Sequence, residues 1–255
     1  MPAPENAIKT SLAAGRLQTG VWLTLANPIA AEIAGRAGFD WCLIDAEHGP
    51  NDIPLILAQL QALAGTPAQA VVRVPIGQDW VLKQVLDLGA QTIMVPMVNT
   101  GADAARAAAA MRYPGAGVRG MGAALARASR YGEIVDYVAS ANDQICLIAQ
   151  VESRAAIENI DAIATTTGVD CVFIGPDDLS ADMGFPGEPD HPEVLAAIDH
   201  AIARITAAGK AAGIVAFDPA QFAGLVQKGV SFLGMGGDSL LLQQALHDLA
   251  GKTPS

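Results

Sequence analysis

The sequence contains few aromatic residues relative to its hydrophobic content. Phe, Trp and Tyr make up 5% of the 255 residues, whereas 51% are hydrophobic, and glycine alone accounts for 26 positions. Small apolar side chains favour close packing of helices on a sheet and disfavour an aromatic-rich β-sandwich. The composition therefore indicates an α/β protein, and the length suits one barrel or one doubly wound sheet.

Positive charge is also scarce. The formal net charge is −11, and the sequence has no run of Lys or Arg. Binding to nucleic acid depends on a clustered basic surface, so we expect no nucleic-acid partner. If the substrate is an anion, an acidic protein of this kind must supply positive charge locally, from a metal ion or from a specific arginine.

Cysteine is rare, and no extended apolar segment is present. Cys42, Cys146 and Cys171 each lie in a short apolar run and form no C-x-x-C pair. We therefore expect them to be small buried side chains rather than redox or metal-binding groups. The first residues do not have the pattern of a targeting peptide, and no run approaches the roughly 18 apolar residues of a membrane span. The expected location is the cytoplasm, with no membrane partner.

Eight short apolar runs alternate with longer segments that have helical periodicity. The runs are predicted strands at residues 20–25, 41–46, 70–74, 92–97, 145–152, 171–175, 211–216 and 230–236. Strict alternation of this kind predicts parallel strands covered by helices. Eight such units close most naturally into a (β/α)8 TIM barrel. We expect residues 1–255 to form a single barrel domain whose last helix spans residues 238–250.

A glycine-rich segment at residues 112–132 interrupts this alternation. It contains "GAGVRG" at residues 115–120, a formal match to the G-x-G-x-x-G motif. A dinucleotide site needs that motif between a strand and a helix, whereas here it follows a helix, so we reject this interpretation. We expect the segment to be a mobile loop near the barrel mouth.

Carboxylates follow two neighbouring predicted strands at the end where barrels hold their reacting groups. Asp177 and Asp178 come directly after the run 171–175, and Glu152 ends the run before it. Carboxylates from adjacent strand ends make a hard oxygen site that suits Mg²⁺, Mn²⁺ or Co²⁺. Alternatively, Asp177 and Asp178 cap the short helix that follows them.

Two further side chains at this end are candidates for catalysis. His48 follows the second strand in "LIDAEHGPND" and could be a general base near neutral pH, or a loop histidine satisfied by hydrogen bonds. Arg73 follows two valines in the third strand, where burial is costly unless the guanidinium meets an anion. It could bind a carboxylate or a developing oxyanion, or it could form a structural salt bridge with Glu152 or Asp45.

Five segments together resemble the HpcH/HpaI aldolase family, the metal-dependent class II pyruvate aldolases. They are "WCLIDAEHGPND", "VVRVP", "QVES", "VFIGPDDLSADMG" and "RYPGAGVRGMGAALARAS". The resemblance covers almost the whole chain, in order. It implies reversible cleavage of 4-hydroxy-2-oxo acids, such as 4-hydroxy-2-oxoheptanedioate, to pyruvate and an aldehyde through a pyruvate enolate.

The resemblance also implies a role for particular residues. Glu152 and Asp178 would hold the divalent metal, Arg73 would bind the C2 oxygen of the enolate, and His48 would be the base, oriented by Asp87. Gln150 and the backbone of Gly175, Pro176, Asp177 and Asp178 would contact the substrate, and Trp22, Met121, Val215 and Phe217 are expected walls of the aldehyde pocket. The family usually has a small or uncharged residue at the position of Asp177, so this carboxylate is a departure from its pattern.

Three points are left open by the sequence. The resemblance implies a homo-hexamer in which the helix at 238–250 packs on a neighbouring subunit. A lyase for acyl-CoA substrates such as citramalyl- or malyl-CoA is the alternative enzyme, and a non-catalytic 2-oxo-acid binding protein is the alternative outside catalysis. A non-catalytic binding protein would keep Glu152, Asp178 and Arg73 but would not need His48. A lysine Schiff base is disfavoured because the lysines lie in helices, at helix ends or near a terminus.

Overall fold

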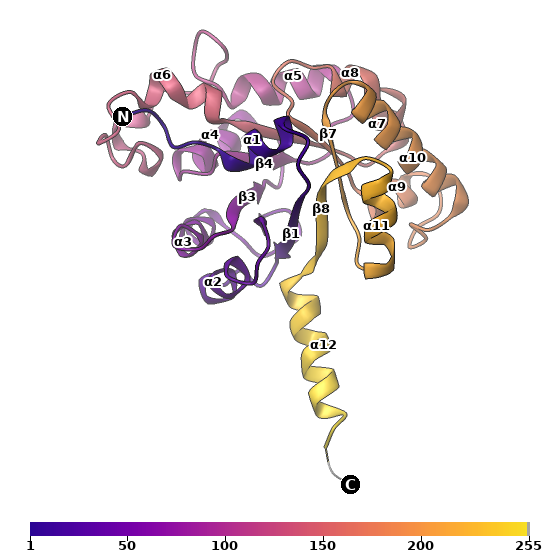
Figure 1. The fold of residues 1–255 in the computed structure, drawn as a ribbon. Helices are drawn as coiled ribbons and strands as arrows, with labels where there is room; N and C mark the ends of the chain where they lie inside the picture. The colour runs from indigo at the N-terminus through magenta and orange to yellow at the C-terminus, as the bar shows by residue number, and fades with distance from the viewer. Residues whose placement is uncertain (254–255) are drawn as a thin grey trace.

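Eight parallel strands close into a barrel in which each strand pairs with its neighbours in chain order, and β8 pairs with β1 (Figure 1). The structure is a computed structural model, and it describes residues 1–253. The strands are β1 Gln18–Leu23, β2 Trp41–Asp45, β3 Gln69–Arg73, β4 Thr92–Val95, β5 Cys146–Val151, β6 Cys171–Ile174, β7 Ala211–Val215 and β8 Val230–Gly237. The predicted (β/α)8 barrel is confirmed.

Helices connect the strands and cover the outside of the barrel. They are α1 Ala7–Ala13, α2 Pro28–Gly35, α3 Ile53–Leu63, α4 Asp79–Asp87, α5 Gly101–Ala110, α6 Tyr137–Ala141, α7 Arg154–Glu158, α8 Ile160–Ala164, α9 Pro176–Asp182, α10 Pro192–Ala207, α11 Pro219–Gln227 and α12 Asp238–Ala250. Short 3₁₀ helices are η1 Ala123–Leu125, η2 Arg127–Ser129 and η3 Asn142–Gln144. Within residues 1–253, no helix combines the length and the apolar character needed to cross a bilayer.

Large and small residues fit together inside the barrel. Trp41 of β2 stacks on Phe232 of β8 with ring centroids 4.2 Å apart. Gly20 of β1 faces the Trp41 ring so closely that a side chain there would overlap it, which explains a glycine inside a strand. Helix α1 closes the amino-terminal end of the barrel, because Ile8 and Leu12 join this interior cluster. The interior is therefore a packed core, and open space is left at the carboxyl end.

The three cysteines belong to the barrel strands. Cys42, Cys146 and Cys171 are unpaired and buried. Burial raises the pKa of the Cys42 thiol to about 12, with a smaller contribution from the charge of Asp238. Their predicted role as small buried side chains is confirmed, because a buried thiol that holds its proton is a poor nucleophile and a poor metal ligand.

Helix α12 does not pack on its own barrel. None of its residues is buried, and Figure 1 shows it projecting away from the carboxyl end of β8. Asp238 fixes its start, because the Asp238 side chain accepts hydrogen bonds from the Thr24 backbone N–H at 2.8 Å and the Thr24 hydroxyl at 2.9 Å. The helix exposes five leucines, namely Leu240, Leu241, Leu242, Leu246 and Leu249.

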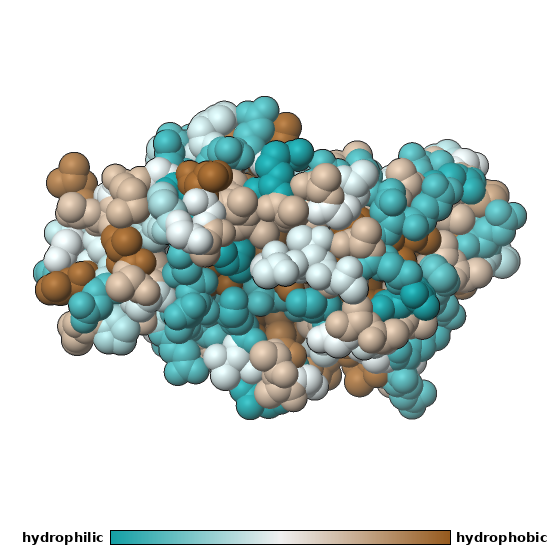
Figure 2. Space-filling view, turned by 90° about the horizontal axis from the view of Figure 1, so that it is seen from above, coloured by the Kyte–Doolittle hydropathy of each residue, from teal (hydrophilic) through white to brown (hydrophobic). Residues whose placement is uncertain are grey.

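The glycine-rich segment lies at the opposite end of the barrel from the mouth, so its predicted position is wrong. The segment follows α5, and a helix in this fold returns the chain to the amino-terminal ends of the strands. Arg127 donates a hydrogen bond of 2.7 Å to the Leu88 carbonyl, which precedes β4, and Tyr113 packs in a cluster with Ala3. Figure 2 looks onto this end, where hydrophobic and hydrophilic residues are interspersed over the surface.

Candidate active site

The carboxyl end of the barrel contains a cavity of about 480 Å³ that gathers most of the predicted site residues. Ten of them line it: Trp22, His48, Arg73, Gln150, Glu152, Gly175, Asp177, Asp178, Val215 and Phe217. They come from the ends of β1, β2, β3, β5, β6 and β7 and from the loops that follow. Because the carboxyl ends of parallel strands meet at one rim, residues far apart in the sequence share this cavity.

Arg73 is the central cation of the cavity and is held by two acidic residues. Its Nε and Nη2 atoms donate hydrogen bonds of 2.9 and 2.7 Å to the two carboxylate oxygens of Asp45. Its Nη1 atom lies 3.0 Å from Glu47 Oε2. Burial lowers the pKa of Arg73, but the hydrogen bond and charge of Asp45 outweigh it, so the pKa is raised overall. The guanidinium is thus fixed in orientation. The salt bridge with Asp45 is one of the alternatives that the sequence analysis gave for Arg73.

Glu47 is held beside Arg73 and beside His48. Burial raises the pKa of the Glu47 carboxyl to about 7; the charge of Arg73 opposes this shift, and the charge of Glu152 adds to it. His48 Nε2 lies 3.9 Å from Glu47 Oε2, and the His48 side chain is 63% exposed. An exposed imidazole at the rim can exchange protons with solvent and reach a substrate that enters the cavity.

The His48 loop is folded back on β2 by buried polar side chains that the sequence analysis did not single out. Asn51 donates a hydrogen bond of 2.7 Å to the Asp45 carbonyl, and Gln59 of α3 donates one of 2.5 Å to the Asn51 side chain. The Glu47 and His48 backbone N–H groups donate to Asp45 Oδ1 at 3.1 and 3.4 Å. No signal in the sequence indicated this role for Asn51 or Gln59, because the role depends on contacts between different elements.

Glu152 is a buried carboxylate whose surroundings are closely fitted. Its Oε1 atom accepts a hydrogen bond of 2.7 Å from the Met97 backbone N–H, and its Oε2 atom accepts one from Gln150. Met97 has a φ of +55°, a left-handed conformation that costs free energy for a non-glycine residue. A Cβ atom at Gly175 would lie 2.7 Å from Glu152 Oε2, so glycine leaves the space that this carboxylate occupies.

The carboxylates of this cavity fit a divalent cation. Burial raises the pKa of Glu152, the hydrogen bond from Gln150 opposes that shift, and the nearby charge of Asp178 adds to it. Glu152 and Asp178 both line this cavity, and a cation between them would offset the charge that raises the pKa of Glu152. No group of three or more His, Cys, Asp or Glu residues within 1–253 is arranged to hold a metal. Glu152 and Asp178 are the two carboxylates that could hold a cation here, with substrate or water oxygens as further ligands.

Asp177 and Asp178 do not act as helix caps. The N-cap residue of α9 is Gly175, which has no side chain to accept a hydrogen bond, and both aspartates lie in the first turn and are exposed. Their position favours negative charge through the helix dipole. The capping alternative for this pair is therefore wrong, and the side chains are free to face the cavity that they line.

Three predicted residues lie outside this cavity in the described chain. Asp87 ends α4 at the amino-terminal side of the barrel, where its Oδ1 atom accepts a bond of 2.6 Å from Arg119. It cannot orient His48 of the same chain, which follows β2 at the opposite end. Met121 is 63% exposed in the glycine-rich segment and is not a wall of this cavity, so that expectation is wrong within one chain. Pro176 lines a neighbouring cavity instead.

The site also contains residues that the sequence analysis did not propose. Thr24, Phe173, Gly237, Ser239 and Leu240 line the cavity together with Asp45. Thr24 and Ser239 share a hydrogen bond of 2.8 Å between their hydroxyl groups. Polar residues at the end of β1 give a weak signal in a sequence, because only closure of the barrel brings them beside the start of α12.

A closed parallel barrel that gathers a buried arginine and several carboxylates at the carboxyl ends of its strands has the arrangement of a barrel enzyme with its active site at that end. Comparison with known proteins narrows that class. Residues 18–245 match the family described as HpcH/HpaI aldolase/citrate lyase, and the chain belongs to this family. It is an enzyme of the aldolase type, a carbon–carbon lyase.

Individual relatives are similar over nearly the whole chain. A hydroxypyruvate/pyruvate aldolase of Agrobacterium fabrum is 52% identical over 252 residues, which cover 99% of this chain and 95% of that protein. A 4-hydroxy-2-oxo-heptane-1,7-dioate aldolase of Salmonella dublin is 50% identical over 248 residues, covering 97% and 94%. The crystal structure of a family protein from Burkholderia cenocepacia J2315 superposes with a TM-score of 0.94 at 37% identity, covering 97% and 98%.

Proposed function

We propose that this enzyme reversibly cleaves 4-hydroxy-2-oxo acids to pyruvate and an aldehyde. The observation that carries the proposal is the gathering of Arg73, His48, Glu152 and Asp178 around one cavity. The named activities of the relatives from Agrobacterium and Salmonella support the same reaction class. Small 2-oxo acids and aldehydes are the expected partners, and the cytoplasm is the expected location.

Glu152 and Asp178 would hold the divalent cation, for which Mg²⁺, Mn²⁺ and Co²⁺ are the candidates. Bound there, the cation would supply Lewis-acid polarisation of the substrate 2-oxo group. Gln150 lies between Arg73 and Glu152, since its Oε1 atom is 3.5 Å from Arg73 Nη1 and its amide donates to Glu152. It would orient the substrate, and the backbone of Gly175 to Asp178 would bind the substrate carboxylate.

His48 and Arg73 would carry out the proton and charge steps. His48 removes the proton of the C4 hydroxyl group, directly or through water, and the C3–C4 bond then breaks to release the aldehyde. The electron pair of that bond remains on the pyruvate part as an enolate. The Arg73 guanidinium, held by Asp45 and Glu47, stabilises the charge on the C2 oxygen. Protonation of C3 then gives pyruvate.

The assembly proposed from the sequence is a homo-hexamer in which α12 packs on a neighbouring subunit. The five exposed leucines of α12 support this arrangement, because an isolated helix with so much exposed apolar surface gains stability by burying it. Asp87 and Met121 lie at the amino-terminal end of their own barrel, so they would reach a site only from a neighbouring subunit. In that arrangement Asp87 would orient His48 across the interface.

Metal removal tests the proposed function directly. We expect protein treated with a chelator to release no pyruvate from 4-hydroxy-2-oxoheptanedioate, and activity to return when Mg²⁺, Mn²⁺ or Co²⁺ is added. Glu152→Gln should keep the fold but lose metal-dependent turnover, because one ligand carboxylate is neutralised. Full turnover by the chelated protein would contradict the proposal, and a chelator already saturated with calcium is the control for effects of the reagent.

The alternative functions have less support. A coenzyme A substrate carries several phosphates, and Arg73 is the one Arg or Lys among the described residues that line the cavity. A binding protein without catalysis would not need His48 beside Glu47. If the metal-loaded enzyme bound pyruvate and gave no turnover with any 4-hydroxy-2-oxo acid, the binding function would be preferred.

A further inference from the structure

The active-site cavity has an unusual charge balance. Four carboxylates line it, those of Asp45, Glu152, Asp177 and Asp178, and Arg73 is the single Arg or Lys among the described lining residues. Both ends of the Arg73 guanidinium are already engaged, by Asp45 and by Glu47. A metal ion would offset the two ligand carboxylates, and the carboxylate of pyruvate would add a further negative charge. Among the described residues that line the cavity, no unpaired Arg or Lys remains to bind a second carboxylate, such as one on the acceptor.

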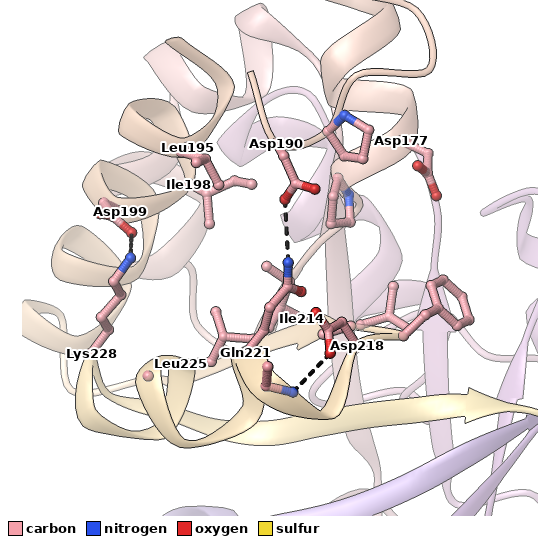
Figure 3. A pocket seen from close by; sticks show the side chains of 17 residues that line it. Asp177, Asp190, Leu195, Ile198, Asp199, Ile214, Asp218, Gln221, Leu225 and Lys228 are labelled. Atoms are coloured by element: carbon pink, nitrogen blue, oxygen red, sulfur yellow. Dashed lines mark hydrogen bonds and ion pairs between the residues drawn. The ribbon is translucent and has the colours of Figure 1, made fainter. Parts of the chain in front are cut away.

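A second cavity lies beside the first on the side of β7 and is lined by several carboxylates as well. It has a volume of about 490 Å³ and shares Asp177, Val215 and Phe217 with the active-site cavity. Figure 3 shows the apolar side chains of Leu195, Ile198, Ile214 and Leu225 in this cavity, with Asp190, Asp199 and Asp218 around them. Lys228 is the one Arg or Lys among its described lining residues, and its Nζ atom is held 2.6 Å from Asp199.

Asp177 is the carboxylate that both cavities share. It lies in the first turn of α9, is exposed, and is adjacent to the ligand candidate Asp178. Asp177 lines the active-site cavity together with Val215 and Phe217. A terminal carboxylate held on this side of the cavity would face Asp177, and it would meet no unpaired Arg or Lys in the described lining.

We propose that this enzyme selects acceptor aldehydes that carry no carboxylate, and that Asp177 is the residue that sets this preference. The inference rests on the proposed aldolase function and names the substrate class of the same site. Uncharged aldehydes, apolar or hydroxylated, would meet no such repulsion from Asp177. The aldehyde released from 4-hydroxy-2-oxoheptanedioate, 4-oxobutanoate, is then a poor partner, because its carboxylate would face Asp177 while Arg73, the one Arg or Lys in the described lining of this chain's cavity, is already paired.

The test compares two acceptors with the same carbon skeleton, one with a terminal carboxylate and one with an uncharged methyl ester. Metal-loaded enzyme and pyruvate are assayed for aldol addition to 4-oxobutanoate and to its methyl ester, with glycolaldehyde as a third, uncharged acceptor. We expect the ratio of kcat/KM for ester over acid to be about tenfold or more in the unaltered enzyme. Asp177→Asn, which removes the charge and keeps the shape, should lower that ratio about three- to tenfold. The fall should come mainly from better use of the acid.

The matched control is Asp143→Asn. Asp143 is an exposed residue of η3 before β5, at the amino-terminal end of the barrel, so this change alters the net charge equally but away from the mouth. It should leave the ratio unchanged. Raising the salt concentration to about 0.5 M should narrow the ratio in the unaltered enzyme, because screening weakens repulsion at an exposed carboxylate. The salt measurement tests charge selection in the unaltered enzyme, so it does not depend on the folding of Asp177→Asn.

The results separate this inference from the proposed function. A ratio near one in the unaltered enzyme, or a ratio that neither Asp177→Asn nor salt changes, would overturn the charge selection while leaving the aldolase function intact. Absence of addition to all three acceptors under every metal would overturn the aldolase function, and the inference with it.

Discussion

At the scale of single residues, the identity of several site positions follows from what each one touches. Gly175 is required because any Cβ atom there would collide with Glu152, and Arg73 is acceptable in a buried strand because Asp45 meets it with two oxygens. A buried arginine that loses such a partner becomes an uncompensated charge, which is strongly destabilising. The same contacts that fix Arg73 also place Glu47 where its carboxyl is hard to ionise.

Glu47 gives a prediction about stability and pH. Its pKa rises from 4.5 to about 7 on folding, so the folded state holds this proton more tightly than the unfolded state. The stabilisation is therefore complete below pH 4.5 and is lost as the pH rises through 7. We expect the free energy of unfolding of metal-free protein to fall by about 3 kcal/mol over this range through Glu47. Denaturant unfolding at pH 5, 6, 7 and 8 measures it.

Glu47→Gln should remove that part of the pH dependence. The control is Glu158→Gln, an exposed glutamate of α7, which should leave the slope of stability against pH as it is in the unaltered protein. Equal slopes for the unaltered protein and Glu47→Gln would show that the carboxyl is already ionised in the folded state at pH 5.

At the scale of elements, helix α3 supports the catalytic loop from behind. Gln59 is fully buried on α3 and holds Asn51, which in turn holds the Asp45 carbonyl at the end of β2. The chain of contacts links a helix interior to the loop that carries Glu47 and His48. Preorganised support of this kind keeps a reacting group within a few tenths of an ångström of its working position.

Replacing Gln59 by Leu should therefore affect catalysis as well as stability. The Asn51 side chain would lose its partner, at a cost of about 1–3 kcal/mol of stability. We expect kcat for cleavage of the 4-hydroxy-2-oxo acid to fall about tenfold, with little change in the KM for that substrate. The reason is that His48 moves while the metal site stays in place. Gln61→Leu, on the exposed side of the same helix, is the matched control. A loss of stability with unchanged kcat would mean that Gln59 is only a packing residue.

At the scale of the whole molecule, the position of helix α12 bears on the proposed assembly. Beyond its first turn, which meets β1 and the active-site cavity, the helix is exposed along its length. The proposed assembly would cover this exposed surface, and it would also bring Asp87 of a neighbouring subunit to His48, which Asp87 of the same chain cannot reach. The exposed leucines of α12 offer an apolar surface for such a contact.

Leu246→Glu tests this arrangement. A charge on the exposed apolar side of α12 should weaken subunit association, so light scattering should show a smaller assembly, and activity should fall with it. Gln243→Glu adds the same charge to a polar position of the same helix and should keep both the assembly and the activity. An unchanged mass and full activity for Leu246→Glu would contradict the role proposed for α12.

The sequence by itself determined the eight strands, their parallel order and the end of the barrel at which the polar residues collect. Each of these follows from local pattern, since apolar runs alternate with helical segments and strand ends share one rim. The alternation also contained the information that residues 112–132 follow a helix and must lie at the amino-terminal end. The prediction of a mobile loop at the mouth rested on glycine content. It placed the segment at the wrong end because composition contains no information about position.

Only the tertiary structure decided the contacts that cross elements. The pairing of Arg73 with Asp45 and Glu47, the support of the His48 loop by Asn51 and Gln59, and the separation of Asp87 from His48 all join residues far apart in the chain. The projection of α12 was likewise decided at this level. Such contacts depend on which side chains barrel closure brings within a few ångströms, and a one-dimensional pattern does not contain those distances.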